Sequence, residues 1–286
     1  MLSFQQAFFS LRAGLQPLYD EREATAIAHG VVQHITGLDK IQRVINKDNT
    51  LNPGQQAGFD HALAELQRGM PLQYVTGTAW FMGRDFFVNS SVLIPRPETE
   101  ELVQWVITDV ANTEGGPRIA DIGTGSGCIA ISIQQAIAGA RVCGWDVSGE
   151  AIKTAQTNAA KHKATTDFIQ ADFLDERTWE GAGEFDVIIS NPPYIPLNEK
   201  NTLHVNVAAF EPATALFVPE GDALLFYRAL AAFGRLHLAA EGAIYCELDA
   251  AHAGACKILF EKEGYSAVLR QDIHSNWRML KATRRK

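Results

Sequence analysis

The chain has 286 residues, of which 47% are hydrophobic and 20% charged, and its formal net charge is -8. This composition excludes disordered and fibrous proteins, and the acidity argues against a general affinity for nucleic-acid backbones or anionic membranes. No segment reaches about 18 apolar residues, the first residues lack the features of a signal peptide, and the four scattered cysteines form no CxxC pair. We therefore expect a cytoplasmic protein with no bound metal and no membrane partner.

The N-terminal part of the chain, residues 1–70, is predicted to be a small helical domain. Apolar residues recur there at spacings of three and four, the period of one face of a helix. They include Phe8, Leu11, Leu15, Ile27, Val31, Ile35, Leu63 and Leu66. Because the later part of the chain carries the chemical motifs, we expect this domain to serve in substrate recognition.

A β-hairpin linker is predicted at residues 71–97. The pattern there shortens to extended runs at 73–77 and 86–93, with Gly83 as a turn signal. A helix follows at 98–110, and the polar, glycine-rich stretch 112–117 ends it.

Residues 98–286 are expected to form the catalytic domain. After residue 117 the chain alternates strands and helices, which predicts an α/β fold with a doubly wound, mainly parallel sheet. Ligands bind such sheets at the carboxyl ends of the strands. Strands are expected at 119–122, 142–145, 168–170, 185–190 and 243–248, with two more in the tail, and helices at 126–137, 149–162, 224–238 and 256–264. Residues 195–221 show little regular pattern, and we expect a long functional loop there.

A glycine-rich loop follows the first strand of this domain and opens a helix. Its sequence is Asp121-Ile-Gly-Thr-Gly-Ser-Gly127, and such a loop lets a ligand approach the backbone closely. The overlapping residues 125–130 also satisfy the looser dinucleotide pattern G-x-G-x-x-A, so the glycines alone leave a nicotinamide cofactor open. The predicted cofactor-binding residues of the loop are Asp121, Gly123, Thr124, Gly125, Ser126 and Gly127.

Two features favour S-adenosylmethionine over a nicotinamide cofactor, although Asp146 ends the next strand at a distance that either cofactor could use. Asp121 places a negative charge that suits a cationic amino-acid moiety and is poorly placed beside a pyrophosphate. Asp146, at the end of the next strand, can accept hydrogen bonds from two ribose hydroxyls. Asp172 offers a carboxylate to an adenine amino group, and Phe173 offers a ring to the base. For these last two residues, a solvated aspartate and a buried core ring are the alternatives.

The most specific motif is the tetrapeptide Asn191-Pro-Pro-Tyr194, which follows the buried strand 185–190. The two prolines fix the backbone and leave the Pro192 carbonyl free to accept, so that this carbonyl and the Asn191 side chain can bind the two hydrogens of an NH2 group. Tyr194 is expected to pack on the flat face of the substrate. An amide nitrogen is a poor nucleophile and no general base is evident here, so positioning must supply most of the rate. We predict catalytic and substrate-binding roles for Asn191, Pro192, Pro193 and Tyr194, and count Asn191 among the cofactor-binding residues as well.

Read together, residues 121–127, 191–194 and the segment Leu93-Ile-Pro-Arg-Pro-Glu-Thr-Glu100 resemble the release factor glutamine methyltransferases, which modify the Gly-Gly-Gln motif of class I peptide chain release factors. The likeness extends over the helical domain, residues 71–77 and residues 211–217. Asn-Pro-Pro-Tyr alone also occurs in adenine-N6 DNA methyltransferases, so the segments before the sheet discriminate between the two families.

The resemblance implies a seven-stranded class I methyltransferase sheet, S-adenosylmethionine as cofactor and class I release factors as protein substrates. It implies that residues 123–127 and Asp146 hold the cofactor, that Phe173 lines the adenine pocket and that 191–194 hold the glutamine amide. Arg96 and Glu98 would border the active site as substrate-binding residues, although Pro97 and Glu98 also suit the first turn of a helix.

The sequence departs from the family pattern at 247–252 and 218–220, and we expect neither segment to touch the chemistry.

Three other functions share some of these features. An adenine-N6 DNA or RNA methyltransferase would need the same acceptor pair, but the acidity of the chain counts against a polyanionic substrate. A glutamine of another protein would use the same residues. A binding module without catalysis would keep the cofactor pocket, but the intact tetrapeptide argues against it.

Overall fold

A computed structural model describes residues 1–111, 113 and 115–285 of the chain. Asn112 and Glu114 of the predicted break after the helix, and Lys286 at the end of the predicted catalytic domain, lie outside the described residues. The described chain divides into two compact units, one of residues 1–78 with 204–210 and one of residues 79–203 with 211–285.

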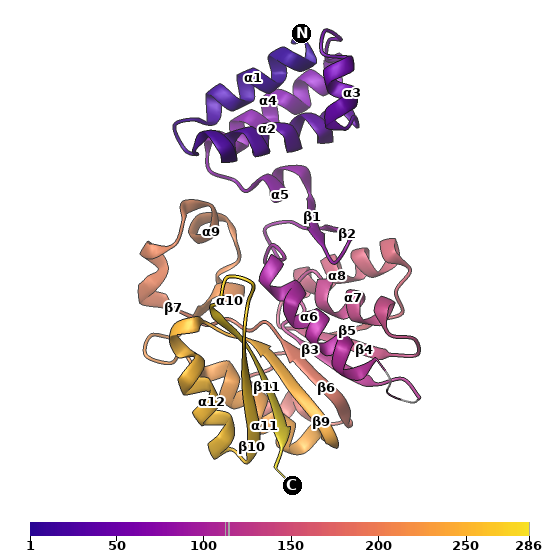
Figure 1. Cartoon of the computed structure of the whole chain (residues 1–286), viewed down its shortest axis with the longest axis vertical. Coiled ribbons are helices and arrows are strands. Elements are labelled where there is room, and N and C mark those ends of the chain that lie inside the picture. The colour runs from indigo at the N-terminus through magenta and orange to yellow at the C-terminus, as the bar shows by residue number, and fades with distance from the viewer. Residues whose placement is uncertain (112, 114, 286) are drawn as a thin grey trace. The chain divides into compact units, whose positions relative to one another are not determined.

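The first unit is helical, as the spacing of its apolar residues predicts (Figure 1). Each of its first four helices begins at a side-chain cap, Ser3, Asp20, Asp39 or Asn52, whose oxygen accepts a backbone N–H of the first turn. The first, second and fourth helices pack around one apolar core. The helices within residues 1–78 are α1 (Phe4–Leu15), α2 (Glu21–Thr36), α3 (Lys40–Ile45), α4 (Pro53–Gln67) and α5 (Leu72–Thr76).

The short helix α5 corrects the prediction of an extended run at 73–77. Pro71 precedes the helix, and Gly77 ends it in the left-handed region at φ 65°. Tyr74, Val75 and Thr76 have β-favouring side chains, but these boundary residues and the contacts of α5 with α2 and α4 outweigh that preference.

The predicted hairpin exists, but it is formed by β1 (Thr78–Phe81) and β2 (Arg84–Phe87). Its turn residues Met82 and Gly83 both have positive φ, the geometry that suits a two-residue hairpin loop. The expected strand 86–93 is therefore wrong beyond Phe87. The Asn158 side chain binds the backbone N–H and carbonyl of Phe87, so this residue cannot continue a ladder.

The second unit contains the predicted α/β sheet, with seven strands in the order β10-β11-β9-β6-β3-β4-β5 (Figure 1). Neighbouring strands run parallel from β9 to β5, whereas β11 lies antiparallel to both β9 and β10. The strands are β3 (Arg118–Ile122), β4 (Arg141–Asp146), β5 (Asp167–Gln170), β6 (Phe185–Ser190), β9 (Leu238–Glu247), β10 (Tyr265–Gln271) and β11 (Trp277–Arg284).

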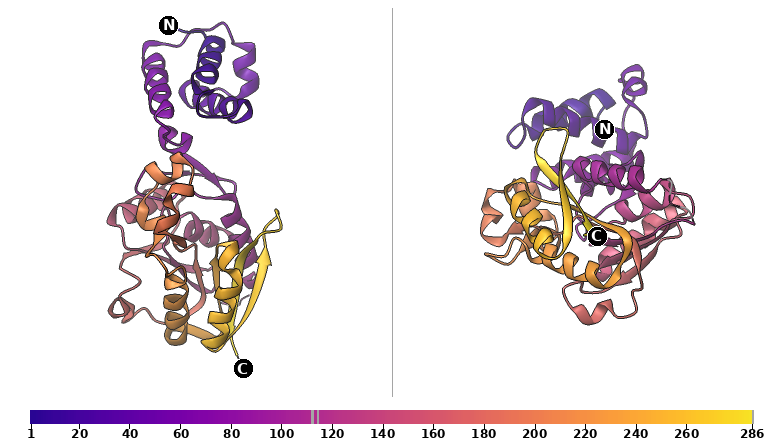
Figure 2. Two further views of the ribbon diagram at one scale, coloured as in Figure 1. Left: turned by 90° about the vertical axis from the view of Figure 1, so that its left-hand side faces the viewer. Right: turned by 60° about the horizontal axis from the view of Figure 1, so that its bottom comes forward.

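Helices cover both faces of this sheet (Figures 1 and 2). One core packs α6 (Pro97–Val110), α7 (Cys128–Ala136) and α8 (Gly149–His162) on residues such as Ile119, Val187 and Met279. The other packs α11 (Leu225–His237) and α12 (Ala253–Lys262) on Ile122, Ile188 and Leu280. Because alternate residues of each strand face opposite sides, both faces of the sheet are buried and its carboxyl edge is left for a site.

Residues 195–221 are more ordered than the sequence predicts. They contain the short parallel pair β7 (Ile195–Pro196) and β8 (Phe217–Val218), the 3-10 turn Leu197–Thr202, and the helices α9 (Val205–Phe210) and α10 (Ala213–Leu216). These pieces are each too short to give a recognisable period, and their positions are set by tertiary contacts. Residues 204–210 are part of the helical unit.

None of the helices in the described part of the chain combines the length and hydrophobicity of a membrane-spanning segment.

Candidate active site

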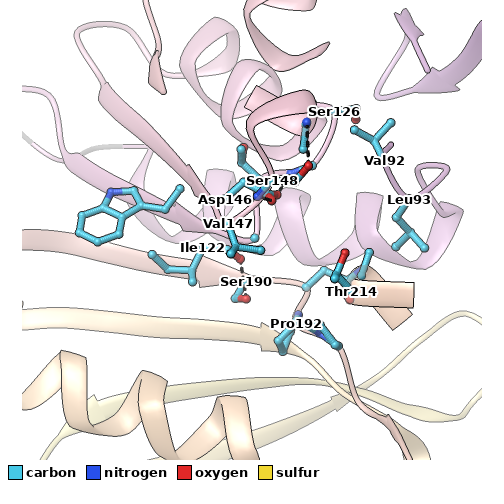
Figure 3. A pocket seen from close by; sticks show the side chains of 18 of the residues that line it. Val92, Leu93, Ile122, Ser126, Asp146, Val147, Ser148, Ser190, Pro192 and Thr214 are labelled. Atoms are coloured by element: carbon cyan, nitrogen blue, oxygen red, sulfur yellow. Dashed lines mark hydrogen bonds between the residues drawn. The ribbon is translucent and has the colours of Figure 1, made fainter. Parts of the chain in front are cut away.

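A pocket opens at the carboxyl edge of the sheet, where the strand order reverses between β3 and β6. This switch point is where open α/β sheets bind ligands. Asp146 and Ser148 face the loop after β3, with Leu93 and Thr214 across the pocket from them (Figure 3). The predicted site residues that line the pocket are Arg96, Gly123, Thr124, Gly125, Ser126, Asp146, Asp172, Phe173, Asn191, Pro192 and Pro193.

The glycine loop, residues 121–127, is held by the neighbouring strand. The backbone N–H groups of Gly123 and Thr124 both donate to the carbonyl of Trp145, at 2.8 Å each. Gly123 and Gly125 have φ of 76° and 53°, which favours glycine. A Cβ built on Gly125 would meet nothing within 4 Å among the described residues. The loop thus presents bare backbone to open space, as a ligand cradle requires.

Asp121 lies beneath this loop and is fully buried. Its Oδ2 accepts hydrogen bonds from the Thr124 hydroxyl at 2.6 Å and from the Ala130 backbone N–H at 3.2 Å. Its Oδ1 is buried without a hydrogen-bond partner among the described residues. Burial, with a smaller contribution from the Asp146 charge, raises the pKa of Asp121 to about 7. The carboxyl group therefore shapes the loop from below, and Asp121 itself is not among the residues that line the pocket.

Asp146 ends β4 and lines the pocket. Its two oxygens accept from the backbone N–H groups of Gly125 and Ser148, each at 2.9 Å (Figure 3). Burial raises the pKa of Asp146, and these backbone donors oppose the shift. Because each carboxylate oxygen has a second lone pair, the group can still accept two hydrogens from a ligand diol.

Asp172 and Phe173 both line the pocket, beyond the end of β5. Asp172 is exposed, and its Oδ1 also accepts the Leu174 backbone N–H. Phe173 is buried and packs against the rings of Trp179 and Phe233. The core therefore fixes the Phe173 ring while the ring also forms part of the pocket wall.

The Asn-Pro-Pro-Tyr tetrapeptide leaves β6 directly beside the glycine loop. The Ser190 hydroxyl donates to the Ile122 carbonyl at 2.7 Å (Figure 3), and a Cβ on Gly123 would lie 4.0 Å from the Asn191 carbonyl oxygen. Tyr194 is not among the residues that line the pocket and packs instead against the core under α11. Burial raises its pKa, so this phenol is neutral.

Asn191 is the first of three side chains that are joined by hydrogen bonds. Its Nδ2 donates to the Thr99 hydroxyl at 3.1 Å, and that hydroxyl donates to Glu247 Oε2 at 2.6 Å. Tyr194 Oη donates to the other carboxylate oxygen of Glu247 at 3.4 Å. The expectation that residues 247–252 stay away from the tetrapeptide is therefore wrong for Glu247, because parallel pairing of β6 and β9 brings their carboxyl ends together.

Arg96 lines the pocket, and its guanidinium donates to Glu211 Oε1 at 2.5 Å. The Glu211 side chain, 1% exposed, also accepts the Ile94 backbone N–H at 3.1 Å. Glu211 thus fastens the proline-rich segment 93–100 to the segment that carries Thr214 of the pocket wall. Glu98 is half-buried in the first turn of α6 and is not among the lining residues.

Sequence reasoning missed the roles of Thr99, Glu211 and Glu247. The one usable signal was positional, since Glu247 is an acidic residue near the end of a predicted buried strand, at the same sheet edge as the tetrapeptide. Thr99 and Glu211 lie within segments 93–100 and 211–217, which carry the family resemblance, but the sequence does not indicate which residues they bind.

Two family models match the chain. The model described as "Methyltransferase small domain" matches residues 103–238, and the "PrmC N-terminal domain" matches residues 11–77.

Curated relatives match nearly the whole chain. A "Release factor glutamine methyltransferase" of Flavobacterium psychrophilum is 37% identical, covering 93% of this chain and 94% of the relative. One from Bacteroides thetaiotaomicron is also 37% identical, with 96% and 98% covered. Among solved structures, a methyltransferase from Pyrococcus furiosus has a TM-score of 0.51 at 17% identity, covering 81% of this chain and 98% of that chain, a likeness of fold alone.

Proposed function

The chain belongs to the family of release factor glutamine methyltransferases and is an S-adenosylmethionine-dependent enzyme, and from this premise we propose its substrate and its catalytic residues. It transfers a methyl group to the side-chain amide nitrogen, N5, of the glutamine in the Gly-Gly-Gln motif of class I release factors. We assign this activity to the cytoplasm, where translation terminates, with no direct nucleic-acid substrate.

The residues of the pocket fit the cofactor. The open backbone at Gly125 leaves room for the amino-acid part of the cofactor. The Asp146 carboxylate suits the ribose diol, and the fixed Phe173 ring suits the purine. The unpartnered Oδ1 of Asp121 supplies an acceptor and, when ionised, a negative charge for a cationic ligand. Bound S-adenosylmethionine supplies a methyl group on a positively charged sulfur.

One observation supports the catalytic assignment most strongly: Asn191 and Pro192 line the same pocket as the glycine loop. Asn191 Oδ1 and the Pro192 carbonyl accept the two hydrogens of the substrate amide and aim its nitrogen at the methyl group. Because the two acceptors draw both N–H bonds to one side, they favour the pyramidal nitrogen of the transition state. Preorganised acceptors of this kind are the means by which an enzyme without a strong base can act on a weak nucleophile.

Transfer of a labelled methyl group to purified, unmethylated release factor tests this proposal. Label should appear on the native factor, and neither on a factor whose motif glutamine is replaced nor on DNA. Label on DNA alone would favour the adenine-N6 reaction, and label on neither release factor nor DNA would favour a different protein substrate.

Asn191→Ala separates catalysis from cofactor binding. We expect kcat to fall by at least about 100-fold, since an acceptor of the transition state is lost, while the Kd for S-adenosylmethionine changes by less than about threefold. Equal losses of turnover and cofactor affinity would contradict the catalytic role of Asn191.

A further inference from the structure

The amide of Asn191 has two possible orientations, and only one of them suits the proposed substrate. With Oδ1 toward the pocket, Asn191 accepts from an NH2 group. With Nδ2 toward the pocket, it would donate, and would favour an oxygen such as that of a carboxylate. The two orientations have nearly the same shape, so packing alone does not choose between them.

The orientation of the Asn191 amide is set by the single hydroxyl hydrogen of Thr99, which is donated to Glu247. The Thr99 hydroxyl has one hydrogen, and its 2.6 Å distance to Glu247 Oε2 is that of a short bond to a charged acceptor. With that hydrogen committed, Thr99 can only accept from Asn191. The atom of Asn191 that lies 3.1 Å away must therefore be the NH2 group, and Oδ1 is left for the pocket.

The hydrogen bonds that join Asn191, Thr99 and Glu247 are shielded from water, which could otherwise donate to or accept from the same groups. Thr99 is 3% exposed and Glu247 2% exposed, on α6 and at the end of β9 respectively. Met279 of β11 pairs with Glu247 in the sheet, and the Tyr227 hydroxyl donates to its backbone carbonyl, so the backbone that carries the carboxylate is fixed.

We infer that Glu247, acting through the Thr99 hydroxyl, is a positioning residue that turns the Asn191 carbonyl oxygen toward the substrate and makes the site select an amide over a carboxylate. The inference rests on the proposed function and adds to it the origin of the discrimination between glutamine and glutamate. The same carboxylate accepts from Tyr194 Oη, so one buried group also helps to hold the tyrosine of the tetrapeptide.

The matched pair Thr99→Val and Thr99→Ser tests the relay. Valine has the shape of threonine without the hydroxyl, whereas serine keeps the hydroxyl. We expect Thr99→Val to lower kcat about 10- to 100-fold, the effect of losing one buried hydrogen bond, and Thr99→Ser to recover most of that loss. The Kd for S-adenosylmethionine should stay within about twofold in both variants, since neither touches the glycine loop.

Selectivity for glutamine over glutamate is a second measurement, and it would not change if Thr99 served only to stabilise the fold. The affinity ratio between release factor with its native motif and release factor with glutamate in place of the glutamine should shrink about tenfold in Thr99→Val, as one orienting bond is lost. Equal kcat for the valine and serine variants, or an unchanged ratio, would overturn the inference. If the wild type modifies no release factor at all, the proposed function itself fails, which is a different result.

A second test uses Glu247, whose pKa burial raises to about 7. The groups that face it are Thr99 and Glu98 of α6, Tyr194, and Arg278 of β11, of which Glu98 raises its pKa and Arg278 lowers it. A protonated Glu247 can donate to Thr99, which frees the threonine hydrogen for Asn191 Oδ1 and reverses the relay.

With both substrates saturating, wild-type kcat should therefore fall as the pH drops below about 7, approaching tenfold per pH unit. Glu247→Gln keeps an acceptor for Thr99 without titrating and should lose this dependence, whereas Glu247→Leu should lower kcat at every pH. The same acid limb in Glu247→Gln would overturn the role of Glu247.

Discussion

Asp121 combines complete burial with an oxygen that has no hydrogen-bond partner among the described residues, and we expect this carboxyl to make cofactor binding sensitive to pH. Its raised pKa means that the free enzyme holds a proton on this carboxyl below about pH 7. A cationic ligand favours the ionised form, so binding must expel that proton, and the affinity falls as the pH falls.

For wild type, we expect the affinity for S-adenosylmethionine to drop about tenfold between pH 7.5 and pH 6, as linkage to one group with a pKa of about 7 requires. Titration calorimetry in buffers of different ionisation enthalpy would measure both the affinity and the released proton. Asp121→Asn should bind more weakly at pH 7.5 but with nearly constant affinity over this range. A wild-type affinity that does not change with pH would mean that Asp121 faces no positive charge of the ligand.

Among the elements, α8 links the hairpin to the glycine loop through one buried side chain. Asn158 is fully buried; its Oδ1 accepts the Phe87 backbone N–H at 2.7 Å, and its Nδ2 donates to the carbonyls of Phe87 and Ser126 at 2.9 Å each. One amide therefore satisfies three backbone groups that belong to two other elements.

Asn158→Ala should lower the free energy of unfolding by about 2–4 kcal/mol, because three backbone groups lose their partner and one of them, the Ser126 carbonyl, is in a buried hydrogen bond. It should also weaken S-adenosylmethionine binding about tenfold, since the loop carbonyl at Ser126 is no longer held. Urea unfolding and calorimetry measure the two effects. The exposed neighbour on the same helix provides a control, Gln156→Ala, and an equal loss of stability in both variants would refute the anchoring role.

The same elements show what sequence can predict. Residues 149–162 were expected to form a helix and do so, because Ser148 caps the start and Lys163 ends it in the left-handed region. The seven-stranded sheet was likewise predicted and is confirmed, since its alternation of strand and helix is a local pattern. The helix α5 was not predicted because three of its residues favour β-structure, although Pro71 and Gly77 at its ends are typical of helix boundaries.

The polar connections of the site were not predictable in this way. Thr99 and Glu247 are 148 positions apart, and Ile94 and Glu211 are 117 apart. Hydrogen bonds over such separations depend on strand order and register, which periodicity does not encode. The glycine loop and the tetrapeptide could be predicted because each carries its chemistry within a few consecutive residues.

At the scale of the whole molecule, the segment between the tetrapeptide and Glu211 passes through the helical unit. Asn206 of α9 donates from Nδ2 to Tyr19 Oη at 2.7 Å, and a Cβ on Gly69 would lie 3.6 Å from both Phe210 and Val205. The helical unit therefore holds residues that are close in sequence to the active site, in addition to its predicted role in gripping the protein substrate.

These two roles can be separated with a chain that begins at Ala79 and with Tyr19→Phe in the full chain. If the helical unit recognises the protein substrate, the truncated enzyme should bind S-adenosylmethionine normally and methylate a short Gly-Gly-Gln peptide, while its kcat/KM for intact release factor falls at least about 100-fold through KM. Tyr19→Phe removes only the bond to Asn206 and should change the rates with both substrates by the same small factor, because it acts on residues 204–210, which follow the tetrapeptide in the sequence. Full efficiency of the truncated enzyme on intact factor would refute recognition by this unit, and an equal loss on peptide and factor would assign it to support of the active-site segment instead.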